Sequence, residues 1–166
     1  MNPVESQPLV PTAGVSTETL SATTLRDLLD LAKPRITTMV VFTTAMGLWL
    51  APGSIGSART ALLLLGTALL VGSANTLNCW YERETDGLMI RTRNRPLPSG
   101  RLEPGTALAL GIASGVFAIP LLAIAINPLT AVLGVIAHAT YVLVYTPLKK
   151  ISPWALELGA IPGAIP

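Results

Sequence analysis

The chain has 166 residues, of which 51% are hydrophobic and 12% are charged, about half the charged fraction of an average soluble domain. Because aromatic residues make up only 5% of the chain, a large soluble core does not account for its apolar content, and the composition indicates a membrane protein. The net charge of +2 gives no reason to expect a nucleic-acid partner, and the single cysteine, Cys79, excludes an internal disulfide.

The first residues, 1–24, are predicted to form a disordered cytoplasmic tail. They are rich in Ser, Thr and Pro and contain no Lys or Arg, which is typical neither of a secretory signal nor of an arginine-rich transit peptide. Glu5 and Glu18 count further against mitochondrial import and favour a bacterial inner membrane. From Leu25 to Ala32, apolar residues recur at helical spacing among charged ones, which predicts a short amphipathic helix along the membrane interface.

The rest of the chain is organised in apolar stretches, each suited to one membrane helix. About 20 apolar residues cover the hydrocarbon core, and the turn signal Asn127-Pro128 divides a region that is too long for one crossing. Complete spans are predicted near 35–52, 60–81, 105–126 and 129–146. The apolar run 153–166 is too short to cross and predicts the start of a fifth span. The sequence therefore predicts an all-α, polytopic transmembrane helix bundle over residues 25–166.

The basic residues set the orientation of this predicted topology. Ten of the eleven Lys and Arg residues lie before the first span, between the second and third spans, or after the fourth span. Only Arg59 falls on the other side. Because short loops rich in Lys and Arg stay on the inner side of a membrane, the N-terminus and the segment 82–103 are expected to face the cytoplasm.

Three oxygen-bearing side chains stand four residues apart where the second predicted span ends: Asn78, Glu82 and Asp86. On a helix this spacing places them on one face, with a drift of about 40° per step. Two carboxylates one turn apart repel each other unless a cation lies between them. Magnesium prefers oxygen ligands and combines one or two carboxylates with substrate phosphates. The spacing therefore indicates a site for Mg²⁺ and a diphosphate.

An arginine-rich segment follows, from Arg91 to Arg101, and is expected at the same cytoplasmic edge. Arginine pairs bidentately with phosphate, so a metal-bound diphosphate would be held from both sides. Taken alone, these residues have a simpler interpretation. Acidic and basic side chains at the end of a membrane helix often form only a solvated face, with the arginines as topology anchors.

Four motifs in combination resemble a known family. They are Lys33-Pro34-Arg35, the motif of Asn78, Glu82 and Asp86, the segment Arg91-Thr92-x-x-Arg95-Pro96-Leu97, and Tyr145-Thr146-Pro147-Leu148-Lys149-Lys150. From about Leu28 to the last residue, the chain resembles the heme O synthases, or protoheme IX farnesyltransferases, of the UbiA superfamily of intramembrane prenyltransferases. Relatives often carry Asp where this chain has Glu82, and the change keeps a carboxylate. That family has two acidic motifs, of which this chain contains the first, so it resembles the N-terminal half.

The resemblance implies an activity and a set of site residues. The complete enzyme is expected to transfer a farnesyl group from farnesyl diphosphate to heme B, giving heme O, within a lipid bilayer and with Mg²⁺ as cofactor. Any association with heme A synthase or with oxidase assembly is left open. Asn78, Glu82 and Asp86 are the implied catalytic residues and metal ligands. The implied diphosphate-binding residues are Arg91, Arg95, Lys33, Arg35, Tyr145 and Lys149.

Two features inside the predicted spans have both a functional and a packing interpretation. An ionisable group such as His138 in a membrane helix is a functional candidate, and a heme substrate makes it a candidate iron ligand. A hydrogen bond from its neutral ring to a neighbouring helix is the favoured interpretation. Gly111 and Gly115 form a Gly-x-x-x-Gly pair, which is predicted to let helices of one bundle approach closely.

Two rival functions remain open from the sequence. The first is a UbiA-type prenyltransferase acting on an aromatic acceptor, because the acidic motif and the Arg-Pro-Leu-Pro-Ser-Gly run suit quinone-precursor enzymes as well. The second is an inactive truncated membrane fragment, or a small membrane subunit that associates with a partner. No turnover is expected from the 166-residue chain alone.

Overall fold

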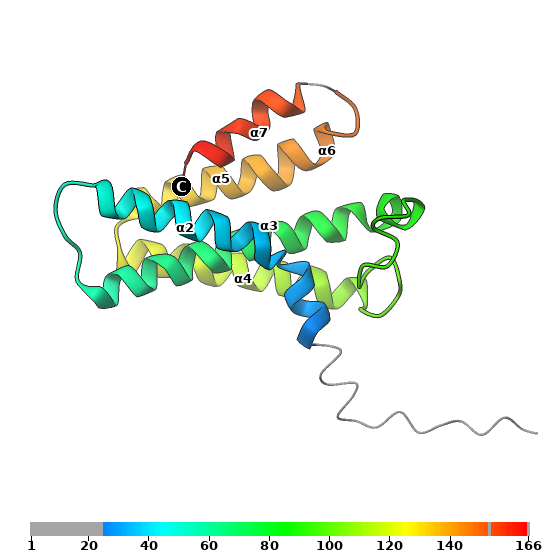
Figure 1. The fold of residues 1–166 in the computed structure, drawn as a ribbon, viewed down its shortest axis with the longest axis horizontal. Coiled ribbons are helices and arrows are strands. Elements are labelled where there is room, and N and C mark those ends of the chain that lie inside the picture. Colours follow the sequence, from blue (N-terminus) through cyan, green and yellow to red (C-terminus); the bar gives the residue numbers. More distant parts are fainter. Residues whose placement is uncertain (1–24, 153, 166) are drawn as a thin grey trace, which may run out of the picture.

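The computed structural model describes residues 25–152 and 154–165, and over these ranges the chain is helical with no strand (Figure 1). The predicted tail, residues 1–24, lies outside the described residues. Residues 25–31 form a short helix. It is followed by α2 (Pro34–Leu50), α3 (Ser57–Leu88), α4 (Pro104–Ala125), α5 (Pro128–Ala139), the π-helix η1 (Thr140–Tyr145), α6 (Thr146–Leu148) and α7 (Ala155–Ala164). The predicted all-α fold class is confirmed.

Three helical stretches of the described chain are long and apolar enough to cross a membrane. They are α3, α4 and the continuous run Pro128–Leu148, which consists of α5, η1 and α6. The first predicted span corresponds to α2, whose 17 residues lie at the short end of the range of about 17–25 that crosses the hydrocarbon core. The described part of the fifth predicted segment forms the ten-residue helix α7.

The helix α3 extends further than the second predicted span. That span was expected to end near residue 81, whereas α3 continues to Leu88. Glu and Arg are good helix formers, so the charged residues after Tyr81 extend the helix beyond the apolar stretch. The helix ends where the backbone N–H of Met89 donates to the carbonyl of Asp86.

The bundle is assembled around α3, which contacts α2, α4, α5 and η1. In Figure 1, α4 runs along α3, and α7 turns back beside α5. One buried apolar cluster lies near the charged end of α3 and contains Leu31, Cys79, Leu97, Leu102 and Ala107. A second cluster lies further along α3 and contains Leu70, Ala118, Leu122 and Ala131.

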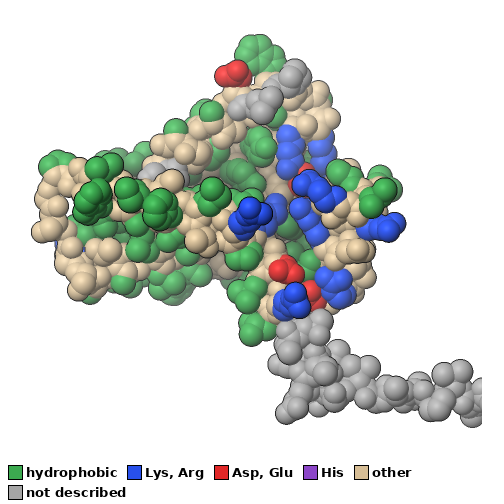
Figure 2. Space-filling view, viewed as in Figure 1, with side chains coloured by type: hydrophobic (Ala, Val, Ile, Leu, Met, Phe, Trp, Pro, Cys, Tyr) green, Lys and Arg blue, Asp and Glu red, His purple; other side chains and the backbone are tan. Residues whose placement is uncertain are grey.

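The outer surface of the bundle suits contact with lipid. Large apolar side chains such as Phe42, Phe117 and Ile124 are exposed on α2 and α4. In water this exposure would be unfavourable, but lipid tails are as apolar as these side chains. On the face shown in Figure 2, Lys and Arg gather at the end of the molecule where α3 meets the 89–103 loop. The bundle thus has apolar sides and a basic end, in agreement with the uneven distribution of Lys and Arg along the sequence.

Small residues allow α4 to approach α3 closely. A Cβ added at Gly111 would lie 2.7 Å from Cδ2 of Leu77, and one added at Gly115 would lie 2.9 Å from Oγ of Ser73. Both glycines are buried, so the predicted packing role of the Gly-x-x-x-Gly pair within one bundle is confirmed. Gly66 makes a similar contact further along α3, where an added Cβ would lie 2.6 Å from Cδ2 of Leu122.

Gly66→Ala is expected to lower the free energy of unfolding by about 1–3 kcal/mol, because Leu122 is only 3% exposed and has little room to move away. Gly163→Ala is the matched control, since nothing lies within 4 Å of a Cβ added there. Alanine favours helix over glycine, so the control is expected to be neutral or stabilising. Denaturant unfolding of the complete protein in detergent, followed by circular dichroism, measures both. Equal stability of the two variants would contradict the close approach of α3 and α4.

Candidate functional site

The charged end of α3 carries the motif that the sequence singled out. Because the helix continues to Leu88, Asn78, Glu82 and Asp86 stand on successive turns. Asn78 and Asp86 are buried, and Glu82 is half-buried. A step of four residues turns by about 40°, so Asp86 lies about 80° around the helix from Asn78. This drift is large enough to direct the two ends of the motif toward different neighbours.

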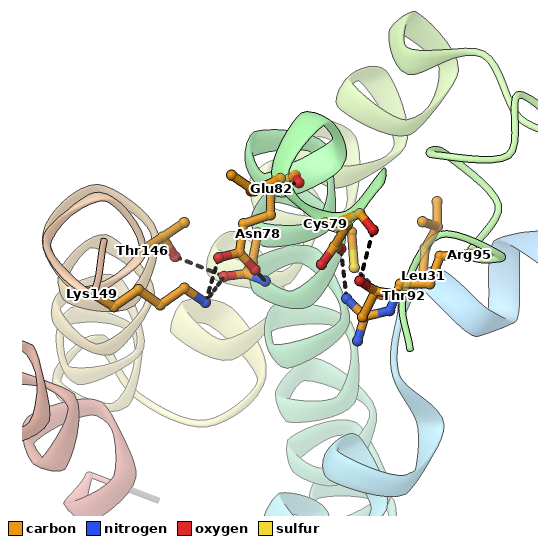
Figure 3. Close-up of polar contacts among 10 residues, drawn as sticks. Leu31, Asn78, Cys79, Glu82, Thr92, Arg95, Thr146 and Lys149 are labelled. Carbon is orange, nitrogen blue, oxygen red and sulfur yellow. Dashed lines mark hydrogen bonds and ion pairs between the residues drawn. The ribbon is translucent and has the colours of Figure 1, made fainter. Parts of the chain in front are cut away.

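Asn78 and Glu82 face α6 and share a cation, the ammonium group of Lys149 (Figure 3). Nζ of Lys149 lies 2.8 Å from Oε1 of Glu82 and 3.2 Å from Oδ1 of Asn78. Nδ2 of Asn78 donates to Oε2 of Glu82 at 2.9 Å. Lysine only donates hydrogen bonds, so the oxygen of the Asn78 amide, and not its nitrogen, faces the ammonium group. Two oxygen-bearing side chains therefore converge on one positive charge.

The π-helix η1 positions the lysine and its neighbours against α3. Tyr145 at the end of η1 stacks on Tyr141, with ring centroids 5.3 Å apart, and Nζ of Lys149 lies 5.3 Å from the Tyr145 ring centroid. Oγ1 of Thr146 lies 3.1 Å from Oδ1 of Asn78. Short π-helices occur frequently at functional sites. The structure thus brings the predicted residues Tyr145 and Lys149 to the Asn78–Glu82 pair.

Asp86 faces a different group, on the other side of α3. Its Oδ2 accepts a hydrogen bond from Nη1 of Arg95 at 2.7 Å, and its backbone carbonyl accepts one from Oγ1 of Thr92 at 2.8 Å. Figure 3 shows Glu82 and Lys149 on one side of α3 and Arg95 on the other. The 89–103 loop is therefore folded back onto the helix end by contacts to Asp86.

A cavity of about 330 Å³ lies beside Asp86, between the 25–31 helix, the end of α3 and the 89–103 loop. Four basic residues line it: Lys33, Arg91, Arg95 and Arg101. We call it the basic cavity. Nε of Arg101 also lies 3.2 Å from Oδ1 of Asp27, which ties the 25–31 helix to the loop. Asp30 and Asp86 also line the cavity, so basic residues outnumber acidic ones by four to two, and the net positive charge favours an anion.

Lys33 reaches the basic cavity through an unusual backbone conformation. Its φ of 49° and ψ of 68° make it the only non-glycine residue with positive φ in the described chain. The left-handed region costs a residue other than glycine roughly 1–2 kcal/mol. Conformations of this kind gather at functional sites, where the surrounding structure maintains them. The turn at Lys33 ends the 25–31 helix and starts α2.

The structure thus divides the predicted site residues between two groups. Lys33, Arg91 and Arg95 lie at the basic cavity with Asp86, whereas Tyr145 and Lys149 lie with Asn78 and Glu82. Arg35 is exposed, does not line the basic cavity and forms no ion pair with a described residue. Within the described ranges, no three His, Cys, Asp or Glu side chains are grouped closely enough to hold a metal ion.

Sequence reasoning missed two contributors to the site. Thr146 lies within the Tyr145-Thr146 motif, and its completely buried hydroxyl beside Asn78 was not anticipated as part of the site. The pair of Asp27 and Arg101 joins residues that are 74 positions apart. No local pattern indicates such a pairing, because neither residue belongs to a periodic motif that includes the other.

The fold and this site define the chain as a helical membrane protein with a cavity rich in basic residues at one end of its bundle. The chain belongs to the UbiA prenyltransferase family, whose model matches residues 40–166.

Curated relatives resemble it closely. A protoheme IX farnesyltransferase of Anaeromyxobacter dehalogenans is 58% identical over 142 residues, which cover 86% of this chain and 48% of the relative. Another protoheme IX farnesyltransferase, from Anaeromyxobacter sp., is 60% identical over 141 residues, which cover 85% of this chain and 48% of the relative. A third, from Myxococcus xanthus, is 51% identical over 144 residues, covering 87% and 49%. The chain spans about half the length of the curated relatives it matches, and no solved structure matches it.

Glu82→Gln is expected to lower the free energy of unfolding by about 1–3 kcal/mol, because it leaves the ammonium group of Lys149 without its charge partner in a site where the Glu82 side chain is 13% exposed. Glu84→Gln removes the same charge two residues away. Glu84 pairs with Arg83 in solvent at 86% exposure, so the effect there is expected to stay within about 0.5 kcal/mol. Chemical unfolding in detergent gives both values, and equal losses would argue against the pairing of Glu82 with Lys149.

Proposed function

We propose that this chain belongs to an enzyme that transfers a farnesyl group from farnesyl diphosphate to heme B, giving heme O. The observation that carries the proposal is the basic cavity, in which four Lys and Arg side chains surround a space beside Asp86. The printed names of the relatives, protoheme IX farnesyltransferases, support the choice of donor and acceptor. The family match supports prenyl transfer as the type of reaction.

In this reaction the bond between the farnesyl carbon and the diphosphate oxygen breaks, and the electron pair leaves with the diphosphate. The allylic carbocation then adds to the terminal carbon of a vinyl group of heme B. Water adds to the cation formed on the other vinyl carbon and loses a proton, which leaves a hydroxyl group there. The difficult step places additional negative charge on the leaving group. Arg91, Arg95 and Lys33 would stabilise that charge through short charge-assisted hydrogen bonds in a cavity that is partly shielded from water.

Magnesium is the proposed cofactor, and the donor chemistry of the site fits it. Asn78, Glu82 and Asp86 offer hard oxygen ligands, and in the structure these oxygens already bind cations. The ammonium group of Lys149, held between Glu82 and Asn78, shows that two of them converge on one positive charge. Asn78 and Glu82 would hold the ion, which when bound supplies positive charge to neutralise the diphosphate. Asp86 pairs with Arg95 on the other side of α3 and would have to turn away from Arg95 to reach the same ion.

A position in the bacterial inner membrane, with the N-terminus in the cytoplasm, is part of the same proposal. It is supported by the placement of ten of the eleven basic residues on one side of the predicted topology. The basic cavity would then open near the cytoplasmic surface, where a water-soluble diphosphate group arrives. The apolar helices would keep the farnesyl chain in the bilayer.

The proposal is tested with the complete gene product in detergent, incubated with farnesyl diphosphate and either heme B or a prenyl-accepting aromatic acid. Mass spectrometry is expected to detect heme O only, and a chelator is expected to abolish its formation until Mg²⁺ is added back. Product formed only on the aromatic acid would reject the heme assignment in favour of an aromatic-acceptor enzyme. Failure to form either product would favour an inactive membrane protein.

Arg91→Gln is expected to raise the KM for farnesyl diphosphate by roughly tenfold or more, because a charge-assisted hydrogen bond is worth about 1.5–3 kcal/mol. Arg91 lines the basic cavity and forms no ion pair with a described residue, so protein stability is expected to be unchanged. Arg93→Gln removes the same charge from the same loop at an exposed position away from the cavity, and is expected to leave the KM unchanged. Parallel effects of the two substitutions would show that the loop acts only through its overall charge.

A further inference from the structure

His138 is held in a defined state by a polar network between α3, α4 and α5. Oγ of Ser73 lies 2.6 Å from the backbone carbonyl of Gly111 and 2.9 Å from Nε2 of His138. A carbonyl only accepts, so the single hydroxyl proton of Ser73 goes to Gly111. Oγ of Ser73 must then accept from the imidazole, which places the ring proton on Nε2 and leaves a lone pair on Nδ1.

This lone pair is available to a ligand. The hydrogen bond between Ser73 and His138 engages only Nε2 of the ring. Nδ1 of His138 accepts no hydrogen bond from a described residue. No fully buried side-chain nitrogen or oxygen in the described ranges lacks a partner. Nδ1, which has none there, is therefore not completely enclosed.

His138 lines a second, larger cavity of about 550 Å³, which we call the apolar cavity. Its walls come from α2, α3, α4, α5, η1 and α7. The lining is mostly apolar, with few polar side chains beyond His138 and Tyr141. Concave apolar sites of this size with a few convergent polar groups are the usual form of a small-molecule site.

We propose that Nδ1 of His138 binds the iron of a porphyrin held in the apolar cavity. The inference rests on the proposed function, because it identifies how the heme acceptor is oriented. Imidazole is a suitable iron ligand through either ring nitrogen. A metal-binding histidine typically donates its other N–H to a fixed acceptor, and the chain of Nε2–H, Ser73 and the Gly111 carbonyl provides such a support.

The location of His138 suits this role. Ser73, its hydrogen-bond partner, precedes Asn78 by five residues on α3, which corresponds to about 8 Å along the helix axis. Cys79, which lines the basic cavity, follows Ser73 by six residues, about 9 Å along the same axis, so an iron ligated here would lie deeper in the bundle than the proposed diphosphate site. The edge of a porphyrin, where its vinyl groups are attached, would extend from the apolar cavity toward that site.

The test measures binding of ferric protoporphyrin IX and of metal-free protoporphyrin IX to the complete protein in detergent. The wild type is expected to give the Soret and electron paramagnetic resonance signals of histidine-ligated iron. His138→Ala is expected to lose these signals and to bind ferric protoporphyrin at least tenfold more weakly, while its affinity for the metal-free ring stays unchanged. Added imidazole is expected to restore the spectrum.

Two further variants separate ligation from packing. Ser73→Ala removes the acceptor for Nε2–H and is expected to weaken iron binding by about 10–100-fold without affecting the metal-free ring. Ser114→Ala removes the same hydroxyl from another membrane-helix serine that does not line the apolar cavity, and is expected to change neither affinity. An unchanged iron spectrum in His138→Ala would overturn the inference. Equal loss of both porphyrins in His138→Ala would also overturn it, by showing a structural role.

These outcomes are distinguishable from failure of the proposed function. If the complete protein makes heme O but its iron spectrum does not depend on His138, iron ligation by His138 is rejected and the proposed farnesyl transfer stands. If iron binding depends on His138 but no farnesyl group is transferred to heme B, iron ligation by His138 stands and the proposed reaction is rejected.

Discussion

Charge pairing at the charged end of α3 organises the rest of the site. A carboxylate taken out of water costs several kcal/mol unless a cation and hydrogen bonds compensate for the lost hydration. Each of the buried or half-buried carboxylates here has such a partner; the pairs are Asp86 with Arg95, Glu82 with Lys149 and Asp27 with Arg101. The partners come from the 89–103 loop and from the residue that follows α6. The contacts that stabilise these charges therefore also hold three segments at one end of α3: the 25–31 helix, the 89–103 loop and the end of α6.

These pairs also set a condition for the proposed chemistry. A diphosphate carries more negative charge than one carboxylate and would compete for Arg95 and Lys149. Asp86 and Glu82 would then lose their partners, and a buried carboxylate without a cation is strongly unfavourable. A divalent ion taken up together with the diphosphate removes this cost. In the proposed reaction, exchange of cations between carboxylates and substrate thus couples metal binding to substrate binding.

Local patterns predicted the helices well, because apolar stretches and turn signals such as Asn127-Pro128 act over a few residues. The second membrane span was predicted to end near residue 81, and the charged residues that follow remain helical to Leu88, as the four-residue spacing of the acidic motif requires. Helical spacing placed Asn78, Glu82 and Asp86 on successive turns, but it did not reveal that their partners lie on two sides of the helix. Which cation reaches which carboxylate depends on how the loop and η1 fold back. Those contacts, like that of Asp27 with Arg101, join residues far apart in the chain.

The close packing of α3 and α4 also explains how the polar network at His138 exists within an apolar bundle. Oγ of Ser73 reaches the Gly111 carbonyl at 2.6 Å because no side chain at position 111 separates the helices. A Cβ at Gly115 would lie 2.9 Å from Oγ of Ser73 and 3.5 Å from Nε2 of His138, so this glycine leaves the space that the imidazole ring occupies. A small-residue pair therefore does more than bring two helices together. It exposes a backbone carbonyl as a hydrogen-bond acceptor and, through Ser73, determines which nitrogen of His138 retains its lone pair.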